Sequence, residues 1–98
     1  MVAHIVMFWL KEKDNEALVQ ETLEKLNGMR GKIPGLLSLS AGRDLTDSAR
    51  SCHICLSTLL ESWEALEGYQ NHSVHLPVKD HMHAVMERSA SADFEIDP

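Results

Sequence analysis

The chain opens on a nearly continuous apolar run, Val2–Leu10, that is rich in β-branched and aromatic side chains. A run of this length and composition is typical of a strand covered on both faces, so we expect it to be central in a sheet. Alternate residues of a strand point to opposite faces. One face carries His4, Val6, Phe8 and Leu10, and the other carries Ile5, Met7 and Trp9.

The next pattern has helical spacing. Asp14 is a natural N-cap, and Glu16 would lie favourably in the first turn. The stripe that follows consists of Leu18, Thr22, Leu26 and Met29. We expect this helix to end within residues 28–31, ahead of Pro34, because a proline disfavours helical geometry in the residue before it.

A second helical region falls into two pieces that separate near His72. Ser62 is the predicted cap of the first piece, and Ser73 is the predicted cap of the second. The first piece carries Trp63, Leu66 and Tyr69, and the second carries Val74, Val78, Met82 and Val85.

Three further segments predict strands. In the second strand, Leu37, Leu39 and Ala41 alternate with small polar residues. Residues 51–60 follow a polar loop as the third strand, and residues 92–96 alternate as the fourth. The order βαββαβ is that of a ferredoxin-like α+β domain, with a four-stranded antiparallel sheet and helices on one face. Residues 1–98 form one domain, because no linker or repeat divides them.

Two helices cover only one face of such a sheet, although the first strand is apolar on both. Exposed Ile5, Met7 and Trp9 would leave a contiguous apolar patch in water, and each such side chain gains about 1.5–3 kcal/mol on burial. A second copy of the sheet, packed face to face, is the simplest cover. We therefore expect a homodimer.

The composition of the chain argues against two classes of partner, nucleic acids and membranes. Fifteen acidic against nine basic residues give a net charge of -6, so no concentrated basic patch is available for nucleic acid. No apolar run approaches the roughly 20 residues needed to cross a bilayer, and the first strand lacks the leader and cleavage site of a signal peptide. We expect a cytoplasmic protein that contacts neither nucleic acid nor membrane.

The two cysteines, Cys52 and Cys55, stand three apart, as in some redox and metal motifs. Residues three apart in a strand point to opposite faces, so the two sulfurs would neither share a metal nor form a disulfide. We expect two partly buried thiols and no cofactor.

Six histidines are unusual in so short a chain. If the first and third strands are neighbours, His4 and His53 point to the helix-covered face, and Tyr69, His72 and His75 lie above it at the helix break. Spacings of three place the helix residues near one another. We expect these five side chains to converge on a pocket.

Three interpretations of this group stay open. His75 could act as a base near neutral pH while Tyr69 hydrogen-bonds a carbonyl oxygen. Paired imidazoles could instead hold a metal, but no carboxylate or thiolate is clearly placed to complete the site, so we predict no metal ligand. The third interpretation is structural, with imidazoles bonded to backbone carbonyls at the helix break and at strand ends.

Several motifs together resemble the stress-responsive A/B barrel (Dabb) domain family over essentially the whole chain. These are the leading His4, the turn Ile33-Pro34-Gly35, the strand ending at Gly42, and the run Ala65-Leu66-Glu67-Gly68-Tyr69-Gln70-Asn71-His72 followed by His75. The family typically has a proline where this chain has Ser73. The resemblance implies a dimeric α/β barrel of two ferredoxin-like protomers.

A plant branch of the family, which resembles olivetolic acid cyclase, cyclises a polyketide without a cofactor. The resemblance to this branch implies that Tyr69 and His75 are a catalytic pair and that His4, His53 and His72 line the pocket. Helix positions that are aromatic in that branch are Leu23 and Leu26 here. They imply a pocket of different shape, and Val6 and Phe8 on the strand complete its predicted lining.

The sequence thus predicts a homodimeric Dabb-type protein that binds a small, apolar, carbonyl-bearing ligand. Cofactor-free acid-base chemistry of a cyclase or lyase type would follow if the histidine and tyrosine act on that ligand. The alternative is a non-enzymatic stress-response or interaction protein whose histidines are structural.

Overall fold

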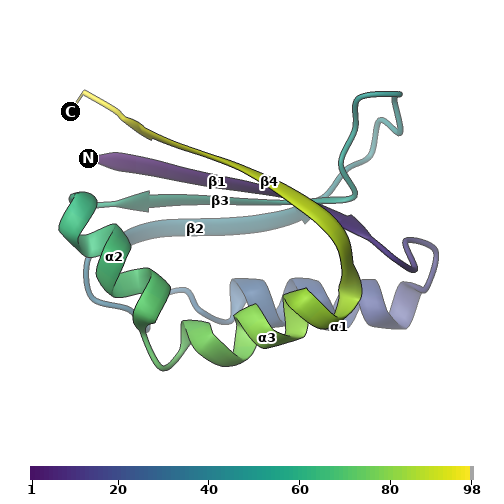
Figure 1. Ribbon diagram of the computed structural model, residues 1–98, viewed down its shortest axis with the longest axis horizontal. Helices are drawn as coiled ribbons and strands as arrows, with labels where there is room; N and C mark the ends of the chain where they lie inside the picture. The colour runs from purple at the N-terminus through teal and green to yellow at the C-terminus, as the bar shows by residue number, and fades with distance from the viewer. Residues whose placement is uncertain (98) are drawn as a thin grey trace.

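The computed structural model describes residues 1–97 as one four-stranded antiparallel sheet with three helices packed on one face (Figure 1). The elements in chain order are β1 (Val2–Leu10), α1 (Glu16–Asn27), β2 (Leu36–Arg43), β3 (Ile54–Leu60), α2 (Trp63–Asn71), α3 (His75–Val85) and β4 (Met86–Glu95). The predicted ferredoxin-like fold is confirmed.

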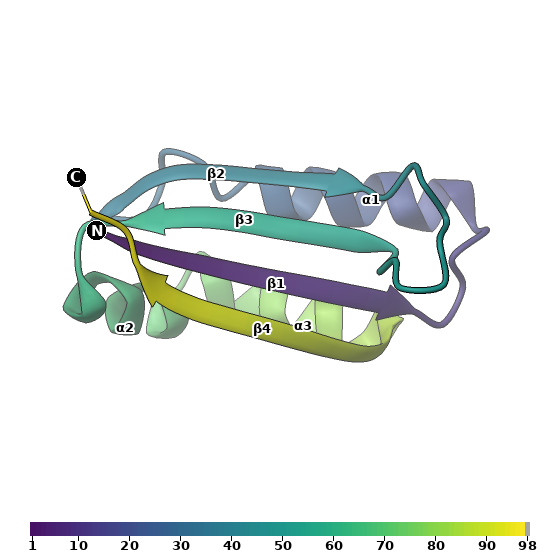
Figure 2. The ribbon, with the colours of Figure 1, turned by 90° about the horizontal axis from the view of Figure 1, so that it is seen from above.

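The strand β1 is central, as its two apolar faces predict. The sheet order is β2-β3-β1-β4, and β1 is antiparallel to both of its neighbours (Figure 2). The register places His4 between Thr58 of β3 and Asp93 of β4. Directly opposite residues of neighbouring strands lie on the same face of a sheet, so all three side chains face the helices.

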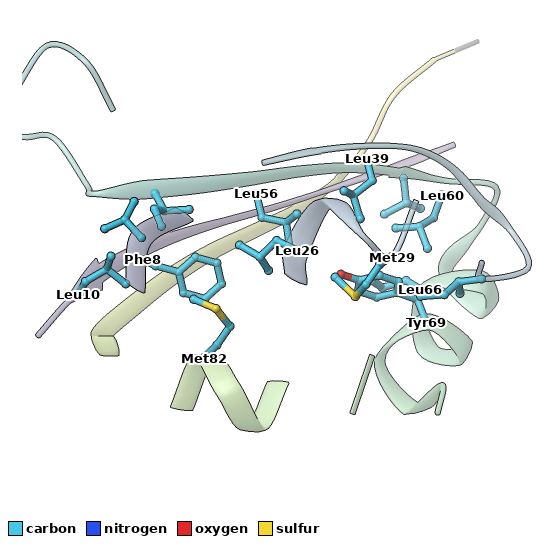
Figure 3. Packing of buried hydrophobic residues seen from close by; sticks show 14 residues of the cluster. Phe8, Leu10, Leu26, Met29, Leu39, Leu56, Leu60, Leu66, Tyr69 and Met82 are labelled. Carbon is cyan, nitrogen blue, oxygen red and sulfur yellow. The ribbon is translucent and has the colours of Figure 1, made fainter. Parts of the chain in front are cut away.

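The hydrophobic core lies between the sheet and the helices. Phe8 of β1 and Leu56 of β3 meet Leu26 of α1 and Met82 of α3, whereas Tyr69 of α2 lies at the other end of the cluster (Figure 3). Tyr69 and Leu26 are among the largest fully buried side chains. Their burial fixes the helices against the inner face of the sheet.

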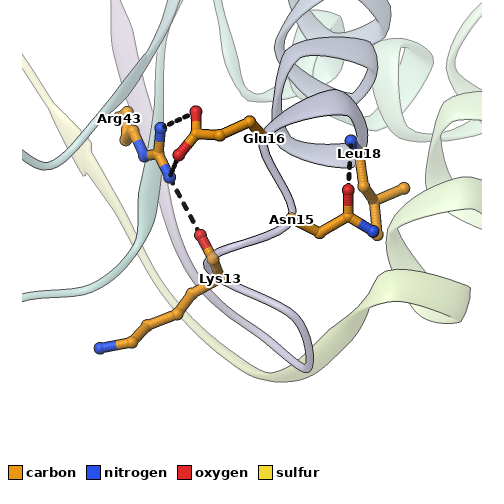
Figure 4. A network of polar contacts seen from close by, with 5 residues as sticks. All are labelled: Lys13, Asn15, Glu16, Leu18 and Arg43. Carbon is orange, nitrogen blue, oxygen red and sulfur yellow. Dashed lines mark hydrogen bonds and ion pairs between the residues drawn. The ribbon is translucent and has the colours of Figure 1, made fainter.

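The cap of α1 is Asn15, and the prediction of Asp14 was wrong by one residue. The Asn15 side-chain oxygen accepts the Leu18 amide at 3.1 Å (Figure 4). Glu16 lies in the first turn and accepts two hydrogen bonds from the Arg43 guanidinium, at 2.7 and 2.9 Å. This pairing lowers the pKa of Glu16.

The caps of the two later helices differ from each other. Ser62 caps α2 by accepting the Ala65 amide at 3.1 Å, as predicted. Ser73 does not cap α3, which begins after Val74 without a side-chain cap. The amide of Val74, the residue before the helix, donates instead to Nδ1 of His72 at 3.0 Å.

Three strand predictions are corrected by the structure. Leu37 is exposed because β2 carries an irregularity that skips it, so Leu36 and Leu39 share the inner face instead. The strand β3 begins at Ile54 rather than Ser51. The strand β4 begins at Met86 rather than Ala92, because an edge strand that faces solvent needs no apolar alternation.

Gly35 sets the approach of β2 to α2. Its φ of +80° is a left-handed conformation that favours glycine, and a Cβ built there would lie 2.7 Å from the Cβ of Ala65.

None of the helices within residues 1–97 is long and apolar enough to cross a membrane.

Candidate functional site

A cavity of about 510 Å³ lies between the inner face of the sheet and the helices α2 and α3. Its size suits a small molecule. Its apolar wall consists of Val6, Phe8, Leu26, Met29, Leu56, Val78, Met82 and Met86. Its polar lining consists of His4, Tyr69, Gln70, Asn71, His75, Lys79, His83, Ser89 and Ser91. The cavity is therefore lined by both apolar side chains and polar groups.

Tyr69 packs against two of the histidines that line the cavity. Its ring centroid lies 4.6 Å from that of His75 and 5.7 Å from that of His4, the latter edge to face. Its hydroxyl is buried and is the one such side-chain polar atom, within residues 1–97, that lacks a hydrogen-bond partner. Burial raises the pKa of Tyr69 to about 12, so the group is a neutral phenol that can donate a proton to a hydrogen bond.

His75 is the first residue of α3 and adjoins this hydroxyl-bearing ring. Its Nδ1 lies 3.0 Å from the Gln70 carbonyl, which can only accept, so Nδ1 carries the proton. In the neutral ring Nε2 then holds a free lone pair. Burial lowers the pKa of His75, with smaller contributions from Lys79 and His4, against the opposing bond to Gln70. His75 is thus suited to accept a proton at neutral pH.

His4 forms a second ordered imidazole in the cavity. Its Nδ1 lies 2.5 Å from Oδ1 of Asp93, its register partner on β4. The His4 side chain is 8% exposed and that of Asp93 is 33% exposed. A carboxylate on Nδ1 fixes the orientation of the ring and turns Nε2 toward other partners, as orienting groups do for metal-bound or catalytic histidines.

The sequence pattern does not single out Asp93 as a partner of His4. His4 lies near the start of the first strand and Asp93 near the end of the last. Antiparallel neighbours with these positions place the two residues opposite each other once the strand order is known.

The structure does not bring His53 into the cavity. His53 precedes β3, where its Nδ1 accepts the Leu10 amide at 2.7 Å and its own amide donates to the Phe8 carbonyl at 2.9 Å. It lines a separate, open hollow together with Lys11 and Glu87. The predicted convergence of His53 with His4 was therefore wrong, because the residue lies outside the strand and beyond the end of the cavity.

His72 is also outside the cavity lining, despite its proximity in sequence to Tyr69. It caps the C-terminal end of α2, and its Nδ1 accepts the Val74 amide. Leu26 lines the cavity as predicted, whereas Leu23 is partly buried against the core and does not line it. The predicted set of pocket residues is thus brought together only in part.

The remaining two histidines have distinct positions on α3. His81 lies with Nε2 at 2.9 Å from the Thr22 hydroxyl, and that hydroxyl donates to the Leu18 carbonyl at 2.8 Å. His81 Nε2–H is then the donor to Thr22, and the bond links α3 to α1. His83 is exposed and lines the cavity.

The cysteines are both free thiols. Cys52 precedes β3, and Cys55 lies within it. Burial raises the pKa of the Cys55 thiol, with a smaller contribution from Cys52. No three His, Cys, Asp or Glu side chains in the described part of the chain are grouped to hold a metal ion.

Comparison with known proteins identifies one family. The model of the Stress responsive A/B Barrel Domain (Dabb) matches residues 2–96. Among curated proteins, no sequence matches significantly.

Solved structures show the same fold at low sequence identity. A dimeric ferredoxin-like protein of unknown function from Thermobifida fusca superposes with a TM-score of 0.88 at 19% identity, covering 97% of this chain and 90% of that one. A Dabb family protein from Mesorhizobium loti has a TM-score of 0.83 at 19% identity, with coverage of 99% and 97%. The hydroxynitrile lyase from Passiflora edulis has a TM-score of 0.84 at 15% identity, with coverage of 98% and 93%.

Proposed function

The chain belongs to the stress-responsive A/B barrel (Dabb) family, and we propose that it binds a small, mostly apolar, carbonyl-bearing molecule in the cavity beneath its sheet. The Tyr69 hydroxyl donates a hydrogen bond to the carbonyl oxygen, and the hydrocarbon part of the ligand packs against Phe8, Leu26 and Met82.

The observation that carries this proposal is the unpartnered hydroxyl of Tyr69. A buried polar group without a hydrogen bond costs about 1–3 kcal/mol, so such groups are uncommon unless something else satisfies them. This hydroxyl belongs to a residue that lines the cavity, and Tyr69 is fully buried. A carbonyl oxygen in the cavity would supply the missing acceptor.

The chemistry that this arrangement supports is proton abstraction beside the carbonyl. Nε2 of His75 would take a proton from the neighbouring carbon, the C–H electron pair would move into the C–C bond, and the C=O pair would move onto oxygen, where Tyr69 hydrogen-bonds the enolate. The enolate carbon would then form a C–C bond to a second carbonyl of the same molecule, whose C=O pair moves onto its oxygen and takes the proton from His75, or the enolate carbon would regain that proton itself. This step needs no cofactor.

His4 and Asp93 would support the same site. Asp93 holds the His4 ring in one orientation, and the His4 and Tyr69 rings lie in a T-shaped arrangement. One structural neighbour is named a hydroxynitrile lyase, so this fold accommodates catalysis in at least one protein.

Binding is tested with a simple aryl ketone, 1-phenylbutan-1-one, by titration calorimetry. Tyr69→Phe should weaken binding by about fivefold to tenfold, the value of a lost neutral hydrogen bond, and leave the melting temperature unchanged or higher. Thr22→Val is the matched control, since it removes a buried hydroxyl that lies outside the cavity lining. Equal affinity in Tyr69→Phe and the natural protein would reject the proposed contact.

Catalysis is tested with the same ketone in deuterated water. The protein should accelerate exchange of the hydrogens beside the carbonyl, and His75→Gln should abolish the acceleration. His72→Gln, outside the cavity lining, should retain it. Binding without accelerated exchange would leave a ligand-binding protein that is not an enzyme.

We also propose that the protein is a homodimer through the outer face of the sheet. All three helices lie on the inner side, which leaves the outer face uncovered (Figure 1). Met7, Leu37 and Phe94 are 38%, 49% and 50% exposed. Structural neighbours from Thermobifida fusca and Bacteroides fragilis are described as dimeric. Exposed apolar side chains on a sheet face that no helix covers are typical of protein interfaces.

The dimer is tested by sedimentation. Met7→Asp places a charge on the central strand of the proposed interface and should shift the mass from two chains to one. Leu76→Asp, on α3, is the control because this leucine is 44% exposed on the helical side of the molecule. A single-chain mass for the unaltered protein at micromolar concentration would reject the proposal.

A non-enzymatic stress-response or interaction protein is the second candidate. The observation that favours it is that His53 and His72 both use a ring nitrogen to bond a backbone amide. If Tyr69→Phe and His75→Gln lower the melting temperature and alter neither ketone binding nor exchange, this candidate is preferred.

A further inference from the structure

The charge of the cavity lining is opposite in sign to that of the protein as a whole. The chain carries fifteen acidic and nine basic residues, yet none of the residues that line the cavity is acidic. Lys79 is the one lining residue with a permanent charge, and the other ionisable groups are His4, Tyr69, His75 and His83. A hollow that carries one fixed positive charge and no negative charge favours an anionic occupant.

The basic residues on α3 follow one line along the cavity. His75, Lys79 and His83 are four residues apart, so they lie on one face of the helix with a rise of about 6 Å between successive members. His75 is beside Tyr69, and the other two lie progressively farther along the helix. A ligand whose carbonyl meets Tyr69 would therefore extend its far end toward Lys79 and His83.

We infer that the ligand is an oxo acid, with its carbonyl at Tyr69 and a carboxylate at Lys79 and His83. This inference rests on the proposed function and adds the second functional group and its position. The Lys79 ammonium offers three donors and makes no ion pair within residues 1–97. It is free to bind a carboxylate.

The strand β4 supplies further hydrogen-bond donors on the opposite wall. Ser89 and Ser91 are register partners of Phe8 and Val6, and both line the cavity. Hydroxyls can donate to a carboxylate oxygen. The hydrocarbon part of a ligand that extends from Tyr69 toward these serines would pack against the Met82 and Phe8 side chains. These two side chains adjoin each other in the core (Figure 3).

The acidic residues nearest in sequence do not occupy this position. On β4, Asp93 is bonded to His4, Glu95 accepts a hydrogen bond from Trp63, and Glu87 lines the separate hollow near His53. Asp80, the acid on α3, is exposed and does not line the cavity. The positive charge at Lys79 is thus available to a ligand.

A matched pair of probes tests the inference. The carboxylate is 4-oxo-4-phenylbutanoate, and the neutral control is its primary amide, which has nearly the same shape. The natural protein should bind the carboxylate about three- to tenfold more tightly than the amide, the range expected for a partly exposed, charge-assisted hydrogen bond. Added salt should reduce this preference, because it screens the exposed charges.

Variants assign the preference to one residue. Lys79→Gln should abolish the preference for the carboxylate and leave the affinity for the amide unchanged. Lys13→Gln makes the same change in net charge outside the cavity lining, and it should retain the preference. His83→Gln should reduce the preference by a smaller factor, because an imidazole offers fewer N–H donors than the Lys79 ammonium.

Each outcome has a distinct meaning. Equal binding of the two probes by the natural protein, or a preference that survives Lys79→Gln, would overturn the oxo-acid inference. If Tyr69→Phe still weakens both probes, the proposed carbonyl site stands without it. Failure of the protein to bind either probe would overturn the proposed function itself and the inference with it.

Discussion

Histidines inside and outside the cavity use the same ring nitrogen in opposite ways. In His53 and His72, Nδ1 accepts a backbone amide, so the neutral ring carries its proton on Nε2. In His75, Nδ1 donates to a carbonyl, and in His4 it faces a carboxylate, so Nε2 is the basic atom. The local partner, rather than the residue type, decides which imidazole can act as a base.

The largest effect is expected where the cavity residue is also part of the core. Tyr69→Ala should lower the free energy of unfolding by about 3–5 kcal/mol, because a fully buried aromatic ring is removed. Tyr69→Phe should change it by less than about 1 kcal/mol, since the lost hydroxyl has no protein partner. Urea unfolding measures both. A large loss in the phenylalanine variant would mean that the hydroxyl has a structural bond.

A smaller loss is expected outside the cavity. His53→Leu should cost about 1–2 kcal/mol in urea unfolding, because it leaves the Leu10 amide without its acceptor. His53→Asn should recover much of this loss, since its side-chain oxygen can accept in place of Nδ1. Equal losses in the two variants would show that packing, rather than the hydrogen bond, is responsible. His83→Leu, at an exposed position, is the control and should remain within about 0.5 kcal/mol.

The link between α1 and α3 should contribute less still. Thr22→Val keeps the shape of a buried side chain but removes its bonds to His81 and to the Leu18 carbonyl. We expect a loss of about 1 kcal/mol by thermal unfolding, with ketone binding unaffected. Weakened binding in this variant would show that the helix spacing controls the cavity.

The smallest expected effect is on how the stability of the fold changes with pH. Burial lowers the pKa of His75 below its usual value near 6.5. At pH values between the lowered pKa and about 6.5, the unfolded chain therefore binds more protons at His75 than the folded chain does. The stabilisation from His75 is complete above about pH 6.5 and is lost as the pH falls through the lowered pKa. Melting temperatures from about pH 8 to about pH 5 should therefore fall less steeply in His75→Gln. An identical slope in both proteins would contradict this.

Most elements of the fold could be predicted because their patterns are strong. The run Val2–Leu10 is apolar on both faces, and it forms the central strand with the predicted bounds. Helix α2 begins after Ser62 as predicted. The start of β4 could not be predicted, since residues 86–91 lie at a sheet edge and place serines at the cavity, where polar groups are tolerated.

The site was less predictable than the fold. The short spacing between Tyr69 and His75 brought those two residues together, and the shared face of β1 added His4. The position of His53 depended on which face of β3 points to the helices. Ile54, Leu56 and Thr58 face the core with His4, so the residue before Ile54 does not share that face, and His53 also precedes the strand. The pairing of His4 with Asp93 depends on strand register, which residue spacing alone does not reveal.

The pairing of β1 with β4 has a consequence for how the site is assembled. These strands are the first and last elements of the described chain, and they lie side by side in the sheet (Figure 2). During folding, contacts between such distant segments form late. Closing a long loop costs conformational entropy before the contacts that it allows can stabilise the structure. A folding intermediate without a docked β4 would lack Asp93, Ser89 and Ser91. Ligand binding should therefore report complete folding, and no partly folded form should bind the ligand.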